Sequence, residues 1–230
     1  MEIENSLLIF ANQMSNKIFV TGIGTDVGKT LVSKILCRVW SADYWKPIQS
    51  GALQSLDSQK VSSIQDENFQ AFPEQFLLSI PLSPHAAAEI DGIQLKVSDF
   101  KLPETEGNLI IEGAGGLMVP INSNGSTILD IIEHLKIPVI LVSRHYLGSI
   151  NHTLLSVKAL RSQQIPILGI IFVGEALPGT EEVIYHNTNL PVLAKIPILD
   201  PFTDETIEAY CETFGKEIHF NITHELERIR

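Results

Sequence analysis

Short apolar runs alternate along the sequence with longer stretches in which apolar residues recur at helical spacing. The runs are rich in β-branched residues and nearly continuous in apolar character, which is typical of parallel strands covered by helices on both faces. The predicted strands are 17–21, 44–46, 108–111, 138–142, 167–173 and 191–196. Because helical stretches separate them, the pattern predicts an α/β fold: an open parallel sheet with helices on both faces.

The clearest helical stretch begins near Gly28, because the apolar residues after it fall on one face of a helix. These residues are Leu31, Val32, Ile35, Leu36, Val39 and Trp40. A second helix starts with Ser149 as its expected N-cap. Its apolar face is Ile150, Leu154, Val157 and Leu160. Further helices are predicted at 56–69, 128–135, 180–186 and 203–216.

The chain shows neither an internal repeat nor a linker rich in Gly, Ser and Pro, so residues 14–230 are predicted to form a single domain. Residues 1–13 precede Met14 and are interpreted as a frayed N-terminal extension or a result of start-site choice. The stretch 72–103 contains four prolines and is expected to be an irregular excursion. Such segments often carry the specific part of a site.

The N-terminal residues do not resemble a secretion signal, because the apolar run Leu7–Ala11 has five residues and follows acidic ones. Later apolar runs, such as 137–142 and 165–173, are shorter than the roughly 20 residues that span a bilayer. We therefore expect a cytoplasmic protein.

Composition narrows the choice of partners. The 230 residues include 27 acidic and 16 basic side chains, for a net charge of −11, and 44% are hydrophobic. An acidic protein lacks the cationic surface that nucleic acids and anionic membranes require, so neither is an expected partner. Cys37 and Cys211 are too few and too distant for a disulfide scaffold or a zinc site. Small molecules are the expected ligands.

The strongest motif is Gly22–Thr30, with the sequence GIGTDVGKT, between a predicted strand and a predicted helix. This is the place of a P-loop, whose backbone amides and lysine bind phosphates while a threonine hydroxyl binds Mg²⁺. Five residues separate Gly22 from Gly28 instead of the usual four, so the match is to a variant. The alternative is that Gly-Lys-Thr merely starts a helix.

Glu112 follows the predicted strand 108–111 and precedes Gly113–Gly116, with the sequence GAGG. Ligands of open parallel sheets lie at the carboxyl ends of the strands. An acid at that edge can hold Mg²⁺, which prefers oxygen ligands, and the glycines let another backbone approach closely. The alternative is an acid that only satisfies amides of the following turn.

Lys46 ends another predicted strand, just before Pro47. A second lysine at the same edge of the sheet would help to neutralise the charge on a transferring phosphoryl group. An ordinary exposed lysine is the alternative. Asp57 follows as a candidate metal ligand or, equally, a helix N-cap.

Several segments in this order resemble the dethiobiotin synthetases, ATP-dependent enzymes of biotin biosynthesis. The segments are Gly22–Thr30, Lys46–Gly51 with Asp57 and Ser58, Ser83–His85, Glu112–Pro120 and Leu147–His152. The likeness extends from about Ile18 to Pro197, and the five-residue spacing within the P-loop is typical of that family. It implies a P-loop NTPase-like fold, with ATP as co-substrate and Mg²⁺ as cofactor.

The resemblance also implies the reaction and its residues. The substrate 7,8-diaminopelargonic acid forms a carbamate with CO2 or bicarbonate, ATP phosphorylates the carbamate, and the second amine closes the ureido ring. Lys29 and Lys46 would be catalytic, with Lys46 bridging carbamate and γ-phosphate. The implied nucleotide-binding residues are Asp26, Val27, Gly28, Lys29, Thr30, Asp57, Glu112, Gly113, Ala114 and Gly115. Those implied for Mg²⁺ are Thr30, Asp57 and Glu112.

The implied substrate-binding residues are Thr25, Lys46, Ser50, Gly148, Ser149 and Asn151. Thr25 and Ser50 would contact the carbamate or amine end. The segment 148–151 opens a helix whose amides could bind the substrate carboxylate, and in the family it comes from the partner subunit of a homodimer. The alternative is a simple helix start. His85 is given no catalytic role.

One departure from the family concerns the nucleotide base. Where the family often has an asparagine that reads the adenine edge, this chain has Val173. Valine offers no side-chain hydrogen bond, so base selectivity must come from backbone groups, for instance near 196–198, or be weak.

Three other functions fit parts of the pattern. Partition or division-site ATPases share the predicted fold, but they bind DNA or membranes through basic or amphipathic segments, which the acidic charge disfavours. Amide-forming synthetases of cobalamin assembly need a further glutaminase domain, for which 230 residues leave no room. The third is a nucleotide-binding regulatory module without turnover.

Overall fold

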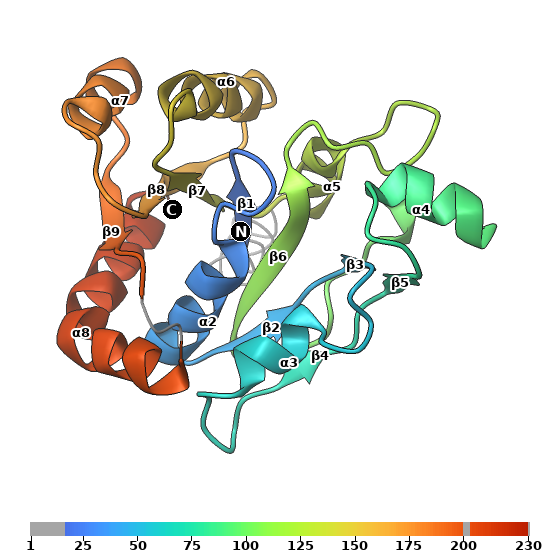
Figure 1. Cartoon of the computed structure of the whole chain (residues 1–230), viewed down its shortest axis with the longest axis horizontal. Coiled ribbons are helices and arrows are strands. Elements are labelled where there is room, and N and C mark those ends of the chain that lie inside the picture. Colours follow the sequence, from blue (N-terminus) through green and yellow to red (C-terminus); the bar gives the residue numbers. More distant parts are fainter. Residues whose placement is uncertain (1–16, 200–202, 230) are drawn as a thin grey trace, which may run out of the picture.

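The structure is a computed structural model that describes residues 17–199 and 203–229. Its centre is a parallel sheet of seven strands (Figure 1). These are β1 (Lys17–Gly22), β2 (Ala42–Trp45), β4 (Ala71–Phe72), β6 (Asn108–Gly116), β7 (Val139–Arg144), β8 (Ile167–Val173) and β9 (Val192–Ile196). The strand order is β4-β2-β6-β1-β7-β8-β9. The predicted open α/β sheet is confirmed, whereas the predicted extension 1–13 lies outside the described residues.

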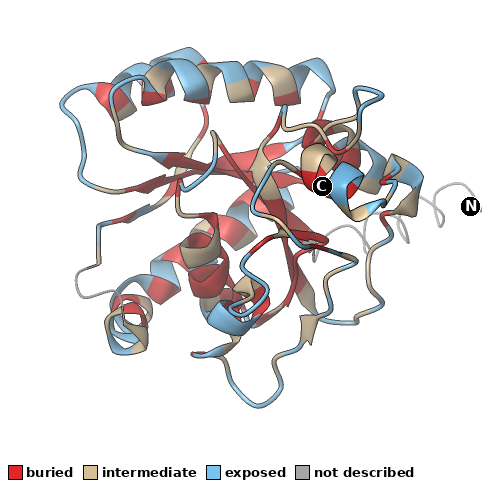
Figure 2. Cartoon of the chain, turned by 45° about the vertical axis from the view of Figure 1, so that its right-hand side comes forward, coloured by how far each residue is buried: buried red, intermediate tan, exposed pale blue. Residues whose placement is uncertain are grey.

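Helices cover both faces of this sheet (Figure 1). One layer holds α2 (Lys29–Trp40), α3 (Asp57–Ser62) and α8 (Asp204–Arg228), and the other holds α5 (Ile128–Leu135), α6 (Ser149–Ser162) and α7 (Thr180–Thr188). Two apolar cores result: Val32 of α2 packs with Ile140 of β7 on one face, and Val157 of α6 packs with Leu141 on the other. Figure 2 shows the buried strands between helices whose outer faces are exposed. The continuous apolar runs of the sequence follow from this double coverage.

The stretch 72–103 is more regular than expected. It contains β5 (Phe76–Leu78), α4 (Pro84–Asp91) and a short 3-10 helix, η1 (Val97–Asp99), and β5 pairs in parallel with β3 (Ile48–Ser50). The prediction of an irregular excursion was therefore wrong. The prolines suggested irregular structure, but Pro84 stands in the first turn of α4, where the missing amide hydrogen costs no helical hydrogen bond.

Helix α8 continues twelve residues beyond the predicted end at residue 216, to Arg228. Apolar contacts at helical spacing continue along it, with Ile218 and Ile222 buried against the sheet. Gly215 lies inside this helix, where an added Cβ would lie 3.1 Å from Val39 Cγ1 of α2. The glycine permits close helix packing. Among the described helices, none is both long and apolar enough to cross a membrane.

Helix α3 is shorter than predicted, and neither Asp57, offered as one of two alternatives, nor Ser149 is an N-cap. Helix α3 ends at Ser62 rather than near 69, and an Asx turn in which the Asn68 amide donates to Asp66 Oδ1 follows it. The N-cap of α3 is Leu56, so Asp57 is not the cap. The N-cap of α6 is Gly148, with φ 108° and therefore in the left-handed region, and Ser149 is the first helical residue.

Candidate active site

A cavity of about 1010 Å³ opens at the carboxyl edge of the sheet. Strand β1 lies between β6 and β7, and β2 pairs with the other side of β6, so the tips of these strands meet at this edge. The predicted site residues that line the cavity are Thr25, Asp26, Gly28, Lys29, Thr30, Lys46, Ser50, Asp57, Glu112, Ala114 and Gly115. Residues that are far apart in the sequence thus share one space, as the strand-end argument predicted.

The loop between β1 and α2 is held in a strained, compact form. Asp26 and Gly28 both have positive φ, 55° and 97°. Gly22 could carry no side chain, because a Cβ there would lie 2.4 Å from Val27 Cγ2. Gly28 is the N-cap of α2, so the first amides of that helix face the cavity end of the loop. Such an N-terminus attracts phosphate.

Lys29 extends across this loop. Its Nζ donates to the backbone carbonyl of Gly24 at 2.9 Å, and the residue is 8% exposed. Burial lowers the pKa of Lys29 to about 8; the negative charge of Glu112 opposes the shift and the positive charge of Lys46 adds to it. An anion bound beside Lys29 would restore its charge.

Lys46 lies between two carboxylates. Its Nζ donates to Asp57 and, at 3.1 Å, to Glu112 Oε1. Burial alone would lower the pKa of Lys46, but the charges of Glu112 and Asp57 outweigh it and hold the pKa above its usual value. Burial likewise opposes the effect of Lys46 on Asp57, whose pKa is held below its usual value. Lys46 is therefore a fixed cation, not the exposed lysine of the alternative interpretation.

Glu112 has hydrogen-bond partners on both carboxylate oxygens. Oε1 accepts from Thr30 Oγ1 at 2.9 Å as well as from Lys46, and Oε2 accepts from the Tyr44 hydroxyl at 2.9 Å. Only 1% of the residue is exposed. Its partners lie on α2, on β2 and directly after β2, and β6 continues to Gly116, so Glu112 does not serve to satisfy amides of a following turn. The sequence did not indicate the contact between Tyr44 and Glu112, because Tyr44 looks like any other position of a buried strand.

Asp57 and Glu112 both accept from Lys46 Nζ, and Thr30 Oγ1 donates to the same Glu112 oxygen, so the three residues adjoin one another. Across residues 17–199 and 203–229 there is no group of three His, Cys, Asp or Glu that could hold a metal by itself. Two carboxylates and a hydroxyl nonetheless suit Mg²⁺, which takes oxygen ligands and commonly completes its shell with water and substrate phosphates. The donor set fits that ion.

Comparison with known proteins agrees with this geometry. A family model described as an AAA domain matches residues 16–206. An ATP-dependent dethiobiotin synthetase of Christiangramia forsetii is 49% identical over 206 residues, covering 89% of this chain and 99% of the relative. The chain belongs to the dethiobiotin synthetase family. Other dethiobiotin synthetases agree: that of Rhodopseudomonas palustris is 42% identical, covering 89% and 98%, and that of Brucella ovis is 40% identical, covering 90% and 97%.

Solved structures of other ATPases share the fold of this dethiobiotin synthetase family member. A plasmid partition protein of Borrelia burgdorferi bound to AMPPNP has a TM-score of 0.56 at 12% identity, covering 94% of this chain and 99% of that one. The cell division ATPase MinD of Pyrococcus furiosus has a TM-score of 0.55 at 13% identity, covering 94% and 100%. At this identity the likeness shows the P-loop NTPase-like architecture alone.

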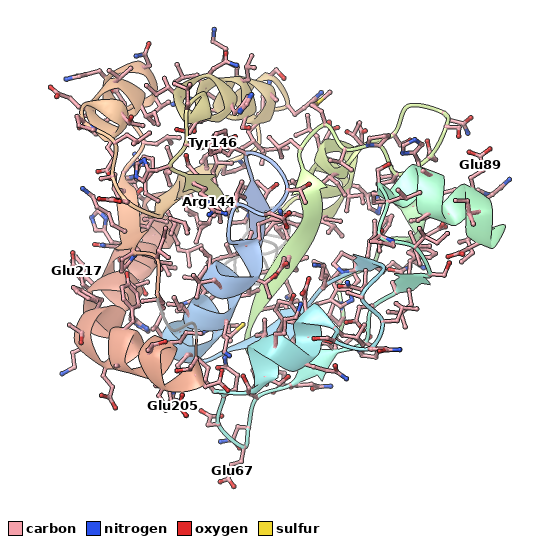
Figure 3. The ribbon with its side chains drawn as sticks, in the orientation of Figure 1. Glu67, Glu89, Arg144, Tyr146, Glu205 and Glu217 are labelled. Carbon is pink, nitrogen blue, oxygen red and sulfur yellow. The ribbon has the colours of Figure 1, made fainter. Side chains whose placement is uncertain are left out.

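The end of the cavity away from Lys46 is bordered by Val173, Arg144 and residues 197–199. Val173 packs tightly on the loop, since a Cβ added to Gly28 would lie 3.1 Å from its Cγ1. Arg144 Nη1 donates to the Asp26 carbonyl at 3.0 Å, and Figure 3 shows this side chain beside the loop between β1 and α2. Sequence reasoning missed Arg144, because an arginine at a strand end carries no motif.

Five predicted site residues lie outside the cavity lining. Val27 is buried inside the loop, and Gly113 is pressed against Phe19, whose ring would lie 2.7 Å from an added Cβ. The remaining three, Gly148, Ser149 and Asn151, stand at the start of α6. Within a single chain, the start of α6 therefore does not line this cavity. His85 contacts Ser83 Oγ through Nδ1 at 2.9 Å.

Proposed function

We propose that this chain forms dethiobiotin from 7,8-diaminopelargonic acid, CO2 and ATP. One amine adds to the carbon of CO2 and loses a proton, which gives a carbamate. A carbamate oxygen attacks the γ-phosphorus of ATP, and the bond to the bridging oxygen of ADP breaks. The second amine then attacks the activated carbonyl carbon and loses a proton, and phosphate leaves as the ureido ring closes. The products are dethiobiotin, ADP and phosphate.

The observation that carries this proposal is the pair of cations in one cavity, Lys29 from the P-loop and Lys46 from the tip of β2. Carbamate and γ-phosphate are both anions and repel each other. Fixed positive charge between them lowers the barrier, and phosphoryl transfer depends mainly on positioning and charge of this kind. Lys46 would bridge the two groups, while Lys29 and the amides of 26–30 hold the phosphates, with 113–115 beside them.

Thr30, Asp57 and Glu112 would hold Mg²⁺. When bound, that ion neutralises charge on the β- and γ-phosphate oxygens. The residues themselves orient the site: Thr30 and Lys46 donate to the same Glu112 oxygen and keep it turned toward the cavity.

The amine or carbamate end of the substrate would contact Thr25 and Ser50, which line the cavity. Its carboxylate would bind the amides at the start of α6, residues 148–151, from the partner subunit of a homodimer. Leu147, directly before this helix, is fully exposed in the single chain, so a second copy could cover it. We further propose that the enzyme is cytoplasmic.

Phosphate release tests the function. We expect release only when ATP, 7,8-diaminopelargonic acid and bicarbonate are all present. A partition-type ATPase, whose fold is similar, would release phosphate without the amine, and a regulatory module would release none. Either outcome would contradict the proposal.

We expect the enzyme to discriminate only weakly between the bases of different nucleoside triphosphates. Val173 has no polar side-chain atom, so GTP and CTP should replace ATP with less than about a 100-fold loss of kcat/KM. Steady-state kinetics with each nucleoside triphosphate measures this. A larger preference for ATP would show that backbone groups near Pro197 and Ile198, which line this end, read the adenine edge.

Nucleotide binding should take up a proton through Lys29. Its pKa of about 8 in the free protein leaves it about half neutral at pH 8, and phosphates beside it favour the charged form. ADP binding should then take up about half a proton at pH 8 but only about a tenth at pH 7. Calorimetry in buffers of different ionisation enthalpy measures this uptake. Equal uptake at both pH values would contradict the role of burial at Lys29.

A further inference from the structure

Tyr44 is a fully buried residue to which the reaction above gives no role. It stands on β2 opposite Ile110 of β6, and both side chains belong to the core beneath α2. Because side chains alternate along a strand, Glu112 projects from β6 on the same face as Ile110. The Tyr44 phenol reaches past Ile110 and donates to Glu112 Oε2 at 2.9 Å.

The two oxygens of the Glu112 carboxylate therefore lie in different surroundings. Oε1 faces Thr30 and Lys46, which line the cavity. Oε2 faces Tyr44, whose side chain lies in the apolar core. A carboxylate oxygen in such a core is costly without a donor. Tyr44 supplies that donor and so fixes the rotation of the carboxylate.

The Tyr44 hydroxyl is the donor in this hydrogen bond, and Glu112 Oε2 is the acceptor. The hydrogen bonds on the two sides keep Oε2 beside Tyr44 and Oε1 beside the cavity residues Thr30 and Lys46.

We propose that Tyr44 is a positioning residue for the divalent cation: its hydrogen bond holds Glu112 so that Oε1 is presented to the metal. The inference rests on the proposed function, which places Mg²⁺ at Thr30, Asp57 and Glu112. Hydrogen bonds behind a ligand commonly set metal affinity, and their loss typically weakens it 10- to 100-fold. Tyr44 itself does not touch substrate or metal.

The test is Tyr44→Phe, which removes a single oxygen atom. Mn²⁺ serves as the probe, and its binding in the presence of ADP is followed by the loss of the free-ion electron paramagnetic resonance signal. We expect the dissociation constant for Mn²⁺ to rise about tenfold, while ADP affinity without metal changes less than about threefold. The matched control is Tyr210→Phe, because the Tyr210 hydroxyl also donates a 2.9 Å bond, to the Lys195 carbonyl, outside the cavity lining.

The outcomes separate this inference from the proposed metal site. Unchanged Mn²⁺ affinity in Tyr44→Phe, together with lost affinity in Glu112→Gln, would overturn the positioning role and leave the site standing. If wild-type protein with ADP takes up no Mn²⁺ beyond what ADP alone binds, both the site and the positioning role fail.

A second measurement needs no substitution at Tyr44 and covers the case in which Tyr44→Phe does not fold. The chain has four tyrosines, so fluorotyrosine labelling gives four resonances that can be assigned by replacing the other three. Adding Mg²⁺ to the ADP complex should shift the Tyr44 resonance, since the charge on its acceptor changes. An unmoved resonance would overturn the inference.

Discussion

Replacing Lys46 by alanine should lower kcat by about two to three orders of magnitude and change ATP affinity by less than about threefold. Its ammonium group is fixed between Asp57 and Glu112 in the cavity. The positive charge of Lys46 stabilises the transition state, in which carbamate and γ-phosphate approach each other. Its loss therefore lowers the rate of the chemical step and not the affinity for nucleotide. Rapid-quench kinetics with saturating substrates, and ADP titration, separate the two effects.

The control for this variant is Lys60→Ala. Lys60 also pairs with Asp57, at 2.8 Å through Oδ1, but its side chain is half exposed and lies outside the cavity lining. We expect its kcat to stay within about twofold of wild type, as for most exposed ion pairs. Wild-type turnover in Lys46→Ala, or an equal loss in Lys60→Ala, would remove Lys46 from the mechanism.

Replacing Glu112 by glutamine should reduce kcat by about 100-fold or more at ordinary Mg²⁺ concentrations. The amide keeps the shape of the carboxylate, and the Tyr44 hydroxyl can accept from its nitrogen, so the fold should persist. The variant loses a charged oxygen ligand beside Thr30 and one of the two carboxylates that compensate buried Lys46. Raising the Mg²⁺ concentration should restore part of the activity. Metal titration of kcat measures this.

The matched control is Glu181→Gln. Glu181 also bridges two basic side chains, His145 and Lys195, but lies outside the cavity lining. Its substitution should leave kcat and the metal dependence nearly unchanged. A Glu112→Gln variant with the metal dependence of wild type would show that Glu112 is structural only.

The sheet and the phosphate end of the site were predictable because their signals are local. Apolar β-branched runs mark buried parallel strands, and the sequence GIGTDVGKT marks one loop. The carboxyl ends of parallel strands share one edge of the sheet. Lys46 and Glu112 were therefore expected at the same edge, regardless of the sequence between them. The pairing of β1 with β6 and of β6 with β2 makes them neighbours.

The remaining features depend on tertiary contacts that no local pattern encodes. Tyr44 looks like any buried strand residue until β6 places Glu112 beside its hydroxyl. Arg144 is the last residue of the apolar strand β7, and the packing of β7 against β1 brings it to Asp26. Gly215 lies within α8 and packs closely against Val39 of α2, a contact that only the folded chain shows. In the proposal, residues 148–151 bind the substrate from the partner subunit. Their role therefore depends on a contact between two chains, which the sequence of one chain does not show.

The most direct measurement follows the carbon that the two cations are proposed to activate. Protein, ATP, Mg²⁺, 7,8-diaminopelargonic acid and ¹³C-labelled bicarbonate are incubated, and the products are analysed by mass spectrometry and phosphate assay. The expected product is dethiobiotin carrying a single ¹³C at the ureido carbonyl, with one phosphate released for each molecule formed. Phosphate release without labelled dethiobiotin, or an unlabelled product, would contradict it.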